Sequence, residues 1–534
     1  MVSAESPSPK ATDWKFVAAI AVLTVIAVVR VASTHRVFGA TVDEPIHLAC
    51  GYEWFKGELT TDMTHPPLAR ILGALPLRLA GLPYPKPTGM VDRGNQLLYH
   101  GDRYVKNLAR ARMGNLVLLV LAIVTVAAWA RRMFSREVAI VSVAIFTSVP
   151  LMLAHAGLLT TDLSVAATLP LALLALDLYL DAPTWKRATF LGIAIALGML
   201  SKFSFFVFFP PAVLVVLLVK RPLRVRAATL AAAIAIAFLF TWAGYRFDFR
   251  RPANVVERGA EILDWAAPGP FKPLARLLGR IPVPAPTLPL GIAQVRLHEM
   301  GGHSAYLLGS ESRTGWWYYF PVVFFYKSPL PFLILVAWGA VLLARDRHGL
   351  QIVLIPVAIL LTAMTASLNI GARHILPIIP PLSIVAGYAV VHIWRTSRDA
   401  FGRAALIALL AWLFIGVGRE HPDYLPWFNE AAQPNPSWVA ADSNIDWGQD
   451  VLRLARVVEE MKIDHLHSAF MNSLRLDRHG IHATGLKPHQ KVSGWVAVSE
   501  NYLRFGESNG DYDWLRNYRP VRQVGKSIRL YYVP

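Results

Sequence analysis

The stretch FVAAIAVLTVIAVVRV, residues 16–31, decides the class of protein to which this chain belongs. It is almost wholly apolar, and with its neighbours it reaches the about 17 to 25 residues that an α-helix needs to cross a bilayer. The residues before it are polar and long for a signal peptide, so we expect a retained first span. Similar runs follow, and the sequence predicts a polytopic α-helical membrane protein with about 11 transmembrane helices. The expected spans lie near 15–33, 112–130, 137–155, 161–180, 187–201, 203–220, 226–243, 325–344, 349–367, 373–394 and 403–418.

The composition agrees with this class and excludes several others. The chain of 534 residues is 54% hydrophobic and only 16% charged, whereas soluble proteins are about 25% charged. The net charge of +18 is typical of basic cytoplasmic loops near anionic lipid headgroups, and we expect no nucleic-acid partner. The single cysteine, Cys50, excludes an internal disulfide and a cysteine-cluster metal site.

The short connections between the apolar runs indicate how the chain is oriented. Alternate connections carry clusters of Lys and Arg, as cytoplasmic loops do. These are RRMFSR (131–136), DAPTWKR (181–187), KRPLRVR (220–226), ARDRHG (344–349) and RTSRDAFGR (395–403). We therefore expect a multi-pass protein of the plasma (inner) membrane with a cytoplasmic N-terminus and large outer loops at 34–111 and 245–317.

The composition changes after residue 420. Residues 421–534 are polar and rich in Trp, Tyr, Asn and Asp. ADSNIDWGQDVLRLARVVEEMKI (441–463) predicts a turn and an amphipathic helix, and VSGWVAVSE (492–500) and SIRLYYVP (527–534) predict strands. The sequence thus predicts a transmembrane domain over 1–420 and a small extracytoplasmic α/β domain over 421–534.

Three carboxylates are candidate catalytic groups. Asp43 and Glu44 are adjacent in TVDEPIHLACGYEW (41–54), and Asp162 opens the span that follows HAGLLTT. Each could instead be a first-turn carboxylate that stabilises a helix N-terminus. A carboxylate at the membrane surface can also remove a proton from an acceptor hydroxyl or amine.

Basic residues gather on the same predicted face and suit an anionic ligand. Arg70 lies on the expected interfacial helix in THPPLARILGALPLRLAG (64–81), where it either reaches toward headgroups or grips a lipid phosphate. Lys202 stands alone between two apolar runs, where it either reaches for the interface or binds an anion. The candidate phosphate-binding residues are Arg70, Lys202, Arg313, Lys327 and Arg373.

Histidine and tryptophan side chains complete the set of candidates. His65 could be a base, a ligand or a capping residue, and Trp316–Trp317 could form an interfacial belt or a platform for sugar or lipid. The candidate substrate-binding residues are His65, His303, Trp316, Trp317 and His374. HEMGGH (298–303) lacks the HExxH spacing of a zinc protease, so no metal ligand is assigned, although a divalent metal remains possible. Without a P-loop, the energy for a reaction must arrive in a lipid-borne substrate.

The order of these motifs resembles the lipid-sugar-dependent glycosyltransferases of the GT-C fold. The matching strings are the Asp43–Glu44 pair, PPL (66–68), TTD (160–162) and GARHILPIIP (371–380), and DSNIDWGQD (442–450) resembles bacterial members. Within this fold the chain looks like bacterial relatives of the protein O-mannosyltransferases and the lipid A aminoarabinose transferases. Thr64–His65 departs from the acidic–basic pair of the latter family, and residues 421–534 are smaller than the trefoil domain of the former.

The resemblance implies an inverting sugar transfer at the outer face of the membrane. A polyprenyl-phosphate sugar would be the donor, a protein hydroxyl, a lipid or a glycan the acceptor, and Asp43 the base, with membrane lipids around the protein. Two alternatives stay open: a flippase or transporter of polyprenyl-linked glycans, and an outer-face glycan ligase. A transporter would carry charges through the bilayer midplane, whereas the charges here lie toward one face.

Overall fold

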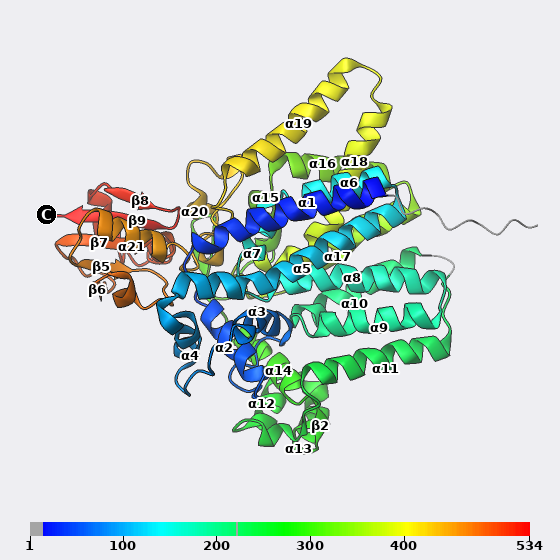
Figure 1. Cartoon of the computed structure of the whole chain (residues 1–534), viewed down its shortest axis with the longest axis horizontal. Coiled ribbons are helices and arrows are strands. Elements are labelled where there is room, and N and C mark those ends of the chain that lie inside the picture. The colour runs from blue at the N-terminus through cyan, green and yellow to red at the C-terminus, as the bar shows by residue number, and fades with distance from the viewer. Residues whose placement is uncertain (1–13, 221–222) are drawn as a thin grey trace, which may run out of the picture.

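The computed structural model describes residues 14–220 and 223–534, so the polar N-terminal stretch lies outside the described residues. Its main body is a bundle of long helices that run side by side (Figure 1). Among the described residues, six apolar helices are long enough to cross a membrane, and two of them include adjoining 3-10 turns. They are built on α1 (Trp14–Ala32), α5 (Tyr104–Met133), α8 (Asp162–Asp181), α11 (Ala227–Gly244), α18 (Ile379–Thr396) and α19 (Ala400–Arg419).

Two further apolar segments are bent rather than straight. Helices α6 (Arg136–Phe146) and α7 (Pro150–Ala156) meet at 69°, and α15 (Tyr319–Lys327) and α16 (Leu330–Leu343) meet at 115°. Prolines at Pro150 and Pro329 stand at these breaks, where a helix cannot continue. Helices α9 (Trp185–Met199), α10 (Ser204–Val219) and α17 (Arg347–Ala363) are shorter. The structure therefore supports six to eight spans by length and composition, and the expected count of 11 is not confirmed.

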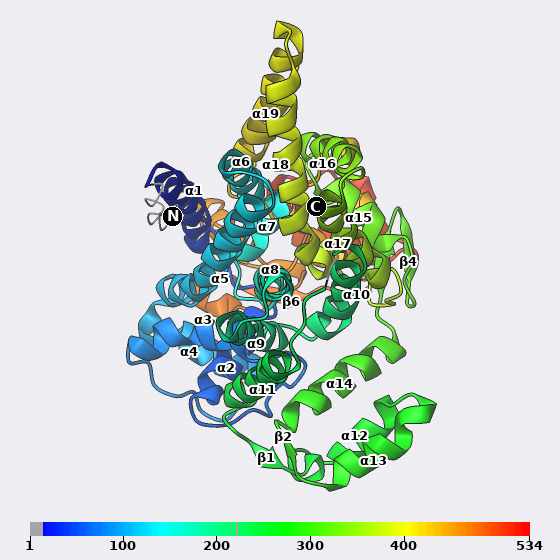
Figure 2. The same ribbon diagram turned by 90° about the vertical axis from the view of Figure 1, so that its right-hand side faces the viewer.

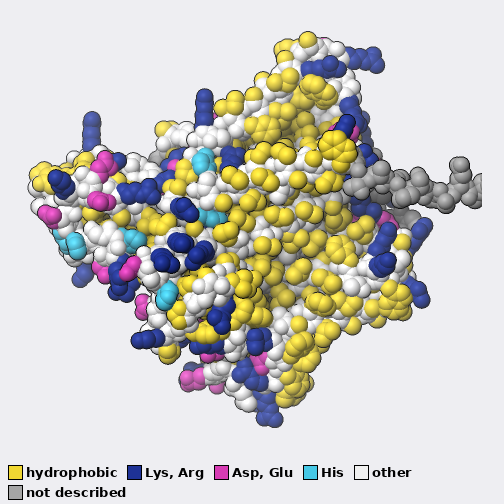
Figure 3. Space-filling model, viewed as in Figure 1, with side chains coloured by type: hydrophobic (Ala, Val, Ile, Leu, Met, Phe, Trp, Pro, Cys, Tyr) yellow, Lys and Arg dark blue, Asp and Glu magenta, His cyan; other side chains and the backbone are white. Residues whose placement is uncertain are grey.

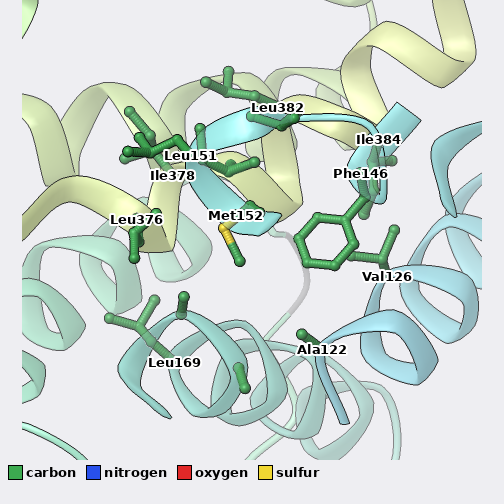
Figure 4. Close-up of a cluster of buried hydrophobic side chains, with 14 of the residues drawn as sticks. Ala122, Val126, Phe146, Leu151, Met152, Leu169, Leu376, Ile378, Leu382 and Ile384 are labelled. Atoms are coloured by element: carbon green, nitrogen blue, oxygen red, sulfur yellow. The ribbon is translucent and has the colours of Figure 1, made fainter. Parts of the chain in front are cut away.

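The centre of the bundle is packed by apolar side chains from several helices. Figure 4 shows Phe146, Met152 and Leu169 facing one another, with further contributions from α5 and α18. Figure 2, which looks along the bundle, places α8 near the middle and α19 projecting at the edge. Few residues of α1 and α19 are buried, and many of their apolar side chains are exposed. Figure 3 shows an apolar band over the face of the bundle in view. A surface of this kind suits contact with lipid.

The two predicted outer loops fold into short elements beside one end of the bundle (Figures 1 and 2). The first contains α2 (Glu44–Trp54), α3 (Leu68–Leu79) and α4 (Met90–Leu98). The second contains α12 (Gly259–Ala266), α13 (Lys272–Arg280) and α14 (Thr287–Gly301), with the strand pairs β1 (Phe249–Arg250) with β2 (Val283–Pro284) and β3 (Ala305–Leu307) with β4 (Ser310–Ser312). Gly51 lets α2 approach α3 closely, since a Cβ there would lie 2.1 Å from the Arg70 carbonyl oxygen.

A five-stranded sheet lies at the same end, which we call the sheet end of the bundle. Its order is β6-β5-β7-β9-β8, with β5 parallel to β6 and β7 and the other pairs antiparallel. The strands are β5 (Leu466–Ala469), β6 (Ala483–Gly485), β7 (Gly494–Ser499), β8 (Arg522–Val524) and β9 (Ile528–Val533), with helices α20 (Pro436–Val439), α21 (Val451–Glu460) and α22 (Glu500–Phe505). The two strands expected from the sequence correspond to β7 and β9. The run 442–450 before α21 is almost entirely buried.

Candidate functional site

Charged side chains from four distant segments meet at the sheet end of the bundle. Asp43 precedes α2, Asp162 begins α8, Lys202 lies between α9 and α10, and Arg373 lies in the 3-10 turn η5 (Ala372–Ile378). Lys202 Nζ donates a hydrogen bond to Asp162 Oδ1 at 2.5 Å. Arg373 Nη1 lies 3.8 Å from Asp162 Oδ2 and 3.5 Å from Asp43 Oδ2. The structure thus brings together four of the residues singled out from the sequence, and we call them the Arg373 cluster.

The members of the Arg373 cluster differ in their access to solvent. The Asp162 side chain is 2% exposed and that of Arg373 13%, whereas that of Asp43 is 32% exposed. A buried carboxylate is tolerated when cations compensate it, and Lys202 and Arg373 do so for Asp162. Asp43 is therefore the carboxylate of the cluster that an incoming molecule can reach most easily.

Several nitrogen atoms at this place are buried without a hydrogen-bond partner among the described residues. They include Arg373 Nε, His374 Nε2 and His155 Nδ1. The Arg373 guanidinium lies over the ring of Trp447, with its Cζ 4.0 Å from the ring centroid, and the His155 ring centroid lies 6.2 Å from that of Trp447. Buried polar groups normally have partners, so these unpaired nitrogens mark a place whose hydrogen bonding a polar ligand or a water molecule would complete. His155 was not identified from the sequence, where it is only the first residue of HAGLLTTD.

Glu44 lies apart from the Arg373 cluster although it adjoins Asp43 in sequence. Its side chain is 1% exposed and pairs with the fully buried Arg112. Arg112 donates from Nε to Oε1 at 2.8 Å and from Nη2 to Oε2 at 2.7 Å. The backbone N–H groups of Thr41 and Leu159 donate to the same carboxylate, each at 2.8 Å. Both oxygens of Glu44 are thereby occupied by contacts that join α2, α5 and the loop before α8.

Arg70 forms a second polar group with the loop that precedes α3. Its Nη1 donates to the carbonyl oxygens of Asp62, at 2.6 Å, and His65, at 3.0 Å, and its Nη2 pairs with the Asp62 carboxylate. Its Nε lies 3.2 Å from His47 Nδ1. Burial by itself would raise the pKa of Asp62, but the neighbouring His65, whose Nδ1 lies 3.9 Å from Asp62 Oδ2, and the charge of Arg70 hold it well below its usual range. Arg70 therefore orders residues 62–65, beside a cavity of about 30 Å³ that Asp62 and His65 help to line.

The remaining candidates have other surroundings. Lys327 is buried, and its Nζ donates to the carbonyl oxygens of Leu425 at 2.6 Å and Asn444 at 2.7 Å. Trp317 is 68% exposed, and Arg313, which directly follows β4, is also exposed. Trp316 is partly buried, and its backbone N–H donates to Asn369 Oδ1 at 2.6 Å. Among the described residues, none of these four forms a hydrogen bond or ion pair with the Arg373 cluster.

The run 442–447, DSNIDW, was noted in the sequence but its residues were not assigned to the site. Asn444 Oδ1 accepts a hydrogen bond from the backbone N–H of Ala372 at 2.9 Å, directly before Arg373. Trp447 supplies the face on which Arg373 lies, and Asp442 Oδ2 lies 3.9 Å from His303 Nε2. In the sequence, only the high density of polar side chains in this run could have pointed to a functional role. The structure adds that the run is almost entirely buried. The described residues contain no group of three His, Cys, Asp or Glu side chains suited to a metal ion.

Comparisons with known proteins bear on the fold. Residues 105–245 match the family model described as dolichyl-phosphate-mannose-protein mannosyltransferase. The structure of ArnT from Cupriavidus metallidurans bound to undecaprenyl phosphate is 14% identical, covers 98% of both chains and superposes with a TM-score of 0.50. The apo oligosaccharyltransferase of Archaeoglobus fulgidus is 13% identical over 77% of this chain and 56% of its own, with a TM-score of 0.48. No curated protein matches the chain significantly. The chain therefore has the GT-C fold of ArnT, and the resemblance expected from its motifs is confirmed.

Proposed function

We propose that this protein is an inverting glycosyltransferase that moves a sugar from a polyprenyl-phosphate donor to an acceptor at the outer face of the plasma (inner) membrane. The observation that carries the proposal is the Arg373 cluster, in which one incompletely paired guanidinium lies beside an accessible carboxylate, Asp43. The fold supports it, since the ArnT structure with this fold contains undecaprenyl phosphate.

Arg373 is the residue best suited to hold the phosphate of the donor. Its contacts with Asp43 and Asp162, at 3.5 and 3.8 Å, are longer than the about 2.7–2.9 Å of a charge-assisted hydrogen bond. Arg112, by contrast, forms such short bonds to Glu44 and to backbone carbonyl oxygens. Arg373 therefore keeps N–H groups for an incoming anion, and Lys202 adds a second positive charge close by.

Asp43 is the residue best placed to act as the base. It would take the proton from the acceptor hydroxyl or amine while the acceptor atom forms a bond to the anomeric carbon. The bond between that carbon and the phosphate oxygen would break, and its electron pair would leave with the polyprenyl phosphate. Arg373 would then stabilise the charge that develops on the phosphate. Attack from the side opposite the leaving group inverts the anomeric centre.

The test is transfer by the purified protein in lipid vesicles, given radiolabelled polyprenyl-phosphate hexoses and candidate acceptors. Wild type is compared with Asp43→Asn, Arg373→Gln and the control Asp464→Asn, which changes an exposed carboxylate elsewhere. We expect Asp43→Asn to lower the rate by about 10² to 10⁴-fold, the usual contribution of a general base, and the control to keep it. The proposal is wrong if folded Asp43→Asn keeps full activity. It is also wrong if the label stays on its carrier and only changes leaflet, which would indicate a transporter.

A further inference from the structure

The run 442–447 is attached to both halves of the Arg373 cluster. Ser443 Oγ donates to the carbonyl oxygen of Ile370 at 2.5 Å, and Asn444 accepts from the Ala372 N–H at 2.9 Å. On the other side, the Val42 N–H donates to the carbonyl oxygen of Trp447 at 3.1 Å. The same short run therefore fixes the backbone before Arg373 and the backbone before Asp43. Its own side chains consequently have defined positions beside the site.

Asp442 is the residue of this run that retains access to solvent. It is partly exposed while the residues from Ser443 to Asp450 are buried. Its φ angle is +59°, a left-handed conformation that Asp and Asn adopt more readily than other side chains. Its Oδ1 accepts from the Ser443 N–H at 2.5 Å, whereas Oδ2 has no hydrogen bond within the described parts of the chain. One carboxylate oxygen is thus available to a ligand.

The carboxyl group of Asp442 is better suited to a hydroxyl ligand than to a phosphate. Burial raises the pKa of its carboxyl group, and the charge of Arg373 opposes that rise. Burial also lowers the pKa of His303, whose Nε2 lies 3.9 Å from Asp442 Oδ2. An ionised carboxylate repels a phosphate but accepts hydrogen bonds from hydroxyl groups.

We propose that Asp442 Oδ2 accepts a hydrogen bond from a hydroxyl group of the donor's sugar, beside the phosphate that Arg373 holds. The inference rests on the proposed function, because the sugar and the phosphate are covalently adjacent in such a donor. Asp442 then serves to recognise the sugar, Arg373 to hold the phosphate and Asp43 to take the proton. The segment that leads into the C-terminal sheet would thereby take part in donor selection.

The experiment measures binding of two lipids to the purified full-length protein in nanodiscs, without any acceptor. The lipids are a radiolabelled polyprenyl-phosphate hexose, taken from those that wild type transfers or binds, and bare polyprenyl phosphate. Asp442→Asn is the informative variant because Asn tolerates the same left-handed backbone. We expect it to bind the glycosylated lipid about 10-fold more weakly, the effect of losing a hydrogen bond to a charged group, and bare polyprenyl phosphate with unchanged affinity. Arg373→Gln should weaken the binding of both, and Asp464→Asn the binding of neither.

Deoxy-hexose donors give a second test that does not depend on the stability of one variant. One deoxy position should bind wild type about 10-fold more weakly and cause no further loss in Asp442→Asn, since both changes remove the same contact. The inference is wrong if Asp442→Asn weakens the binding of both lipids equally, as a structural role would. It is also wrong if the variant changes only the KM for the acceptor. If wild type binds neither lipid, the proposed function fails and this inference fails with it.

Discussion

The adjacent carboxylates Asp43 and Glu44 should respond in opposite ways to loss of charge. Glu44→Gln would leave Arg112, which is fully buried, without its counter-ion. An amide in place of the carboxylate also turns an N–H donor toward Arg112 or toward the N–H of Thr41 or Leu159. Breaking a buried ion pair on one side costs about 3 to 5 kcal/mol. We expect the lower end, about 3 kcal/mol, since Arg112 keeps its bonds to three backbone carbonyl oxygens.

The assay is thermal unfolding of purified variants in one detergent, with transfer measured on the same samples. Glu44→Gln should unfold at a clearly lower temperature yet keep activity per folded molecule. Asp43→Asn should unfold as wild type does and lose transfer. The double variant Glu44→Gln/Arg112→Met should lose less unfolding free energy than the sum of the losses of the two single variants. The reason is that it no longer contains a buried cation without a counter-ion. The reasoning would be refuted by a Glu44→Gln protein that unfolds at the wild-type temperature and is inactive.

Three further predictions concern the surroundings of the cluster. Burial raises the pKa of Asp446 from 3.8 to about 7. The neutral carboxyl group of Asp446 therefore contributes fully to the free energy of unfolding below pH 4, and this contribution falls by up to about 4 kcal/mol as pH rises through 7. Unfolding measured from pH 4 to 8 should show that Asp446→Asn removes this fall. Gly371→Ala would place a Cβ 2.5 Å from Ser443 Oγ at a φ of +149°, and we expect it to lower transfer without loss of the assembled sheet, as measured by activity and circular dichroism. Lys202→Met should draw Arg373 toward the uncompensated Asp162, and binding of bare polyprenyl phosphate should fall about 10-fold.

The sequence allowed the Arg373 cluster to be predicted because its members share one simple property. Asp162, Lys202 and Arg373 each interrupt or adjoin an apolar run, and the basic loops indicate that these positions lie toward the same face. Residues more than 300 positions apart, such as Asp43 and Arg373, could therefore be grouped before any contact was known. Nothing comparable marks His155, which lies within an apolar stretch and resembles an ordinary buried histidine.

The pairing of the charged residues could not be predicted in the same way. Arg112 is the first residue of an expected span, a position where an arginine is typical of the headgroup region. In the structure α5 begins earlier, at Tyr104, and the Arg112 side chain is fully buried. Only the folded structure shows that Arg112 pairs with Glu44 and that Arg70 pairs with Asp62 in the loop before α3. The expected count of 11 spans also included the apolar runs at 187–201, 203–220 and 349–367, whose helices α9, α10 and α17 have only 15, 16 and 17 residues. Apolar composition alone did not show that these helices are shorter than the six full-length spans.

The position of Arg373 between Asp43 and the proposed phosphate has a consequence for the reaction. Without a donor, Arg373 lies 3.5 Å from Asp43, and the donor's phosphate must compete with that carboxylate. When Asp43 takes the acceptor's proton it becomes neutral, and Arg373 is then free to stabilise the leaving phosphate, whose negative charge has grown. Proton uptake and departure of the leaving group would thus strengthen one another in the transition state.

This arrangement predicts that Asp43→Asn binds bare polyprenyl phosphate more tightly than wild type while it loses transfer. The Asn side chain keeps the shape of Asp43 but removes the competing charge, so Arg373 gives its full interaction to the phosphate. At the 3.5 Å separation, with the screening typical of a protein surface, a charge interaction of this kind amounts to a few kcal/mol before desolvation, and we expect about 3- to 10-fold tighter binding. Binding measured at two salt concentrations should show the gain shrinking at high salt. Weaker binding by folded Asp43→Asn would mean that Asp43 supports the phosphate site instead of competing with it, and the coupling would be wrong.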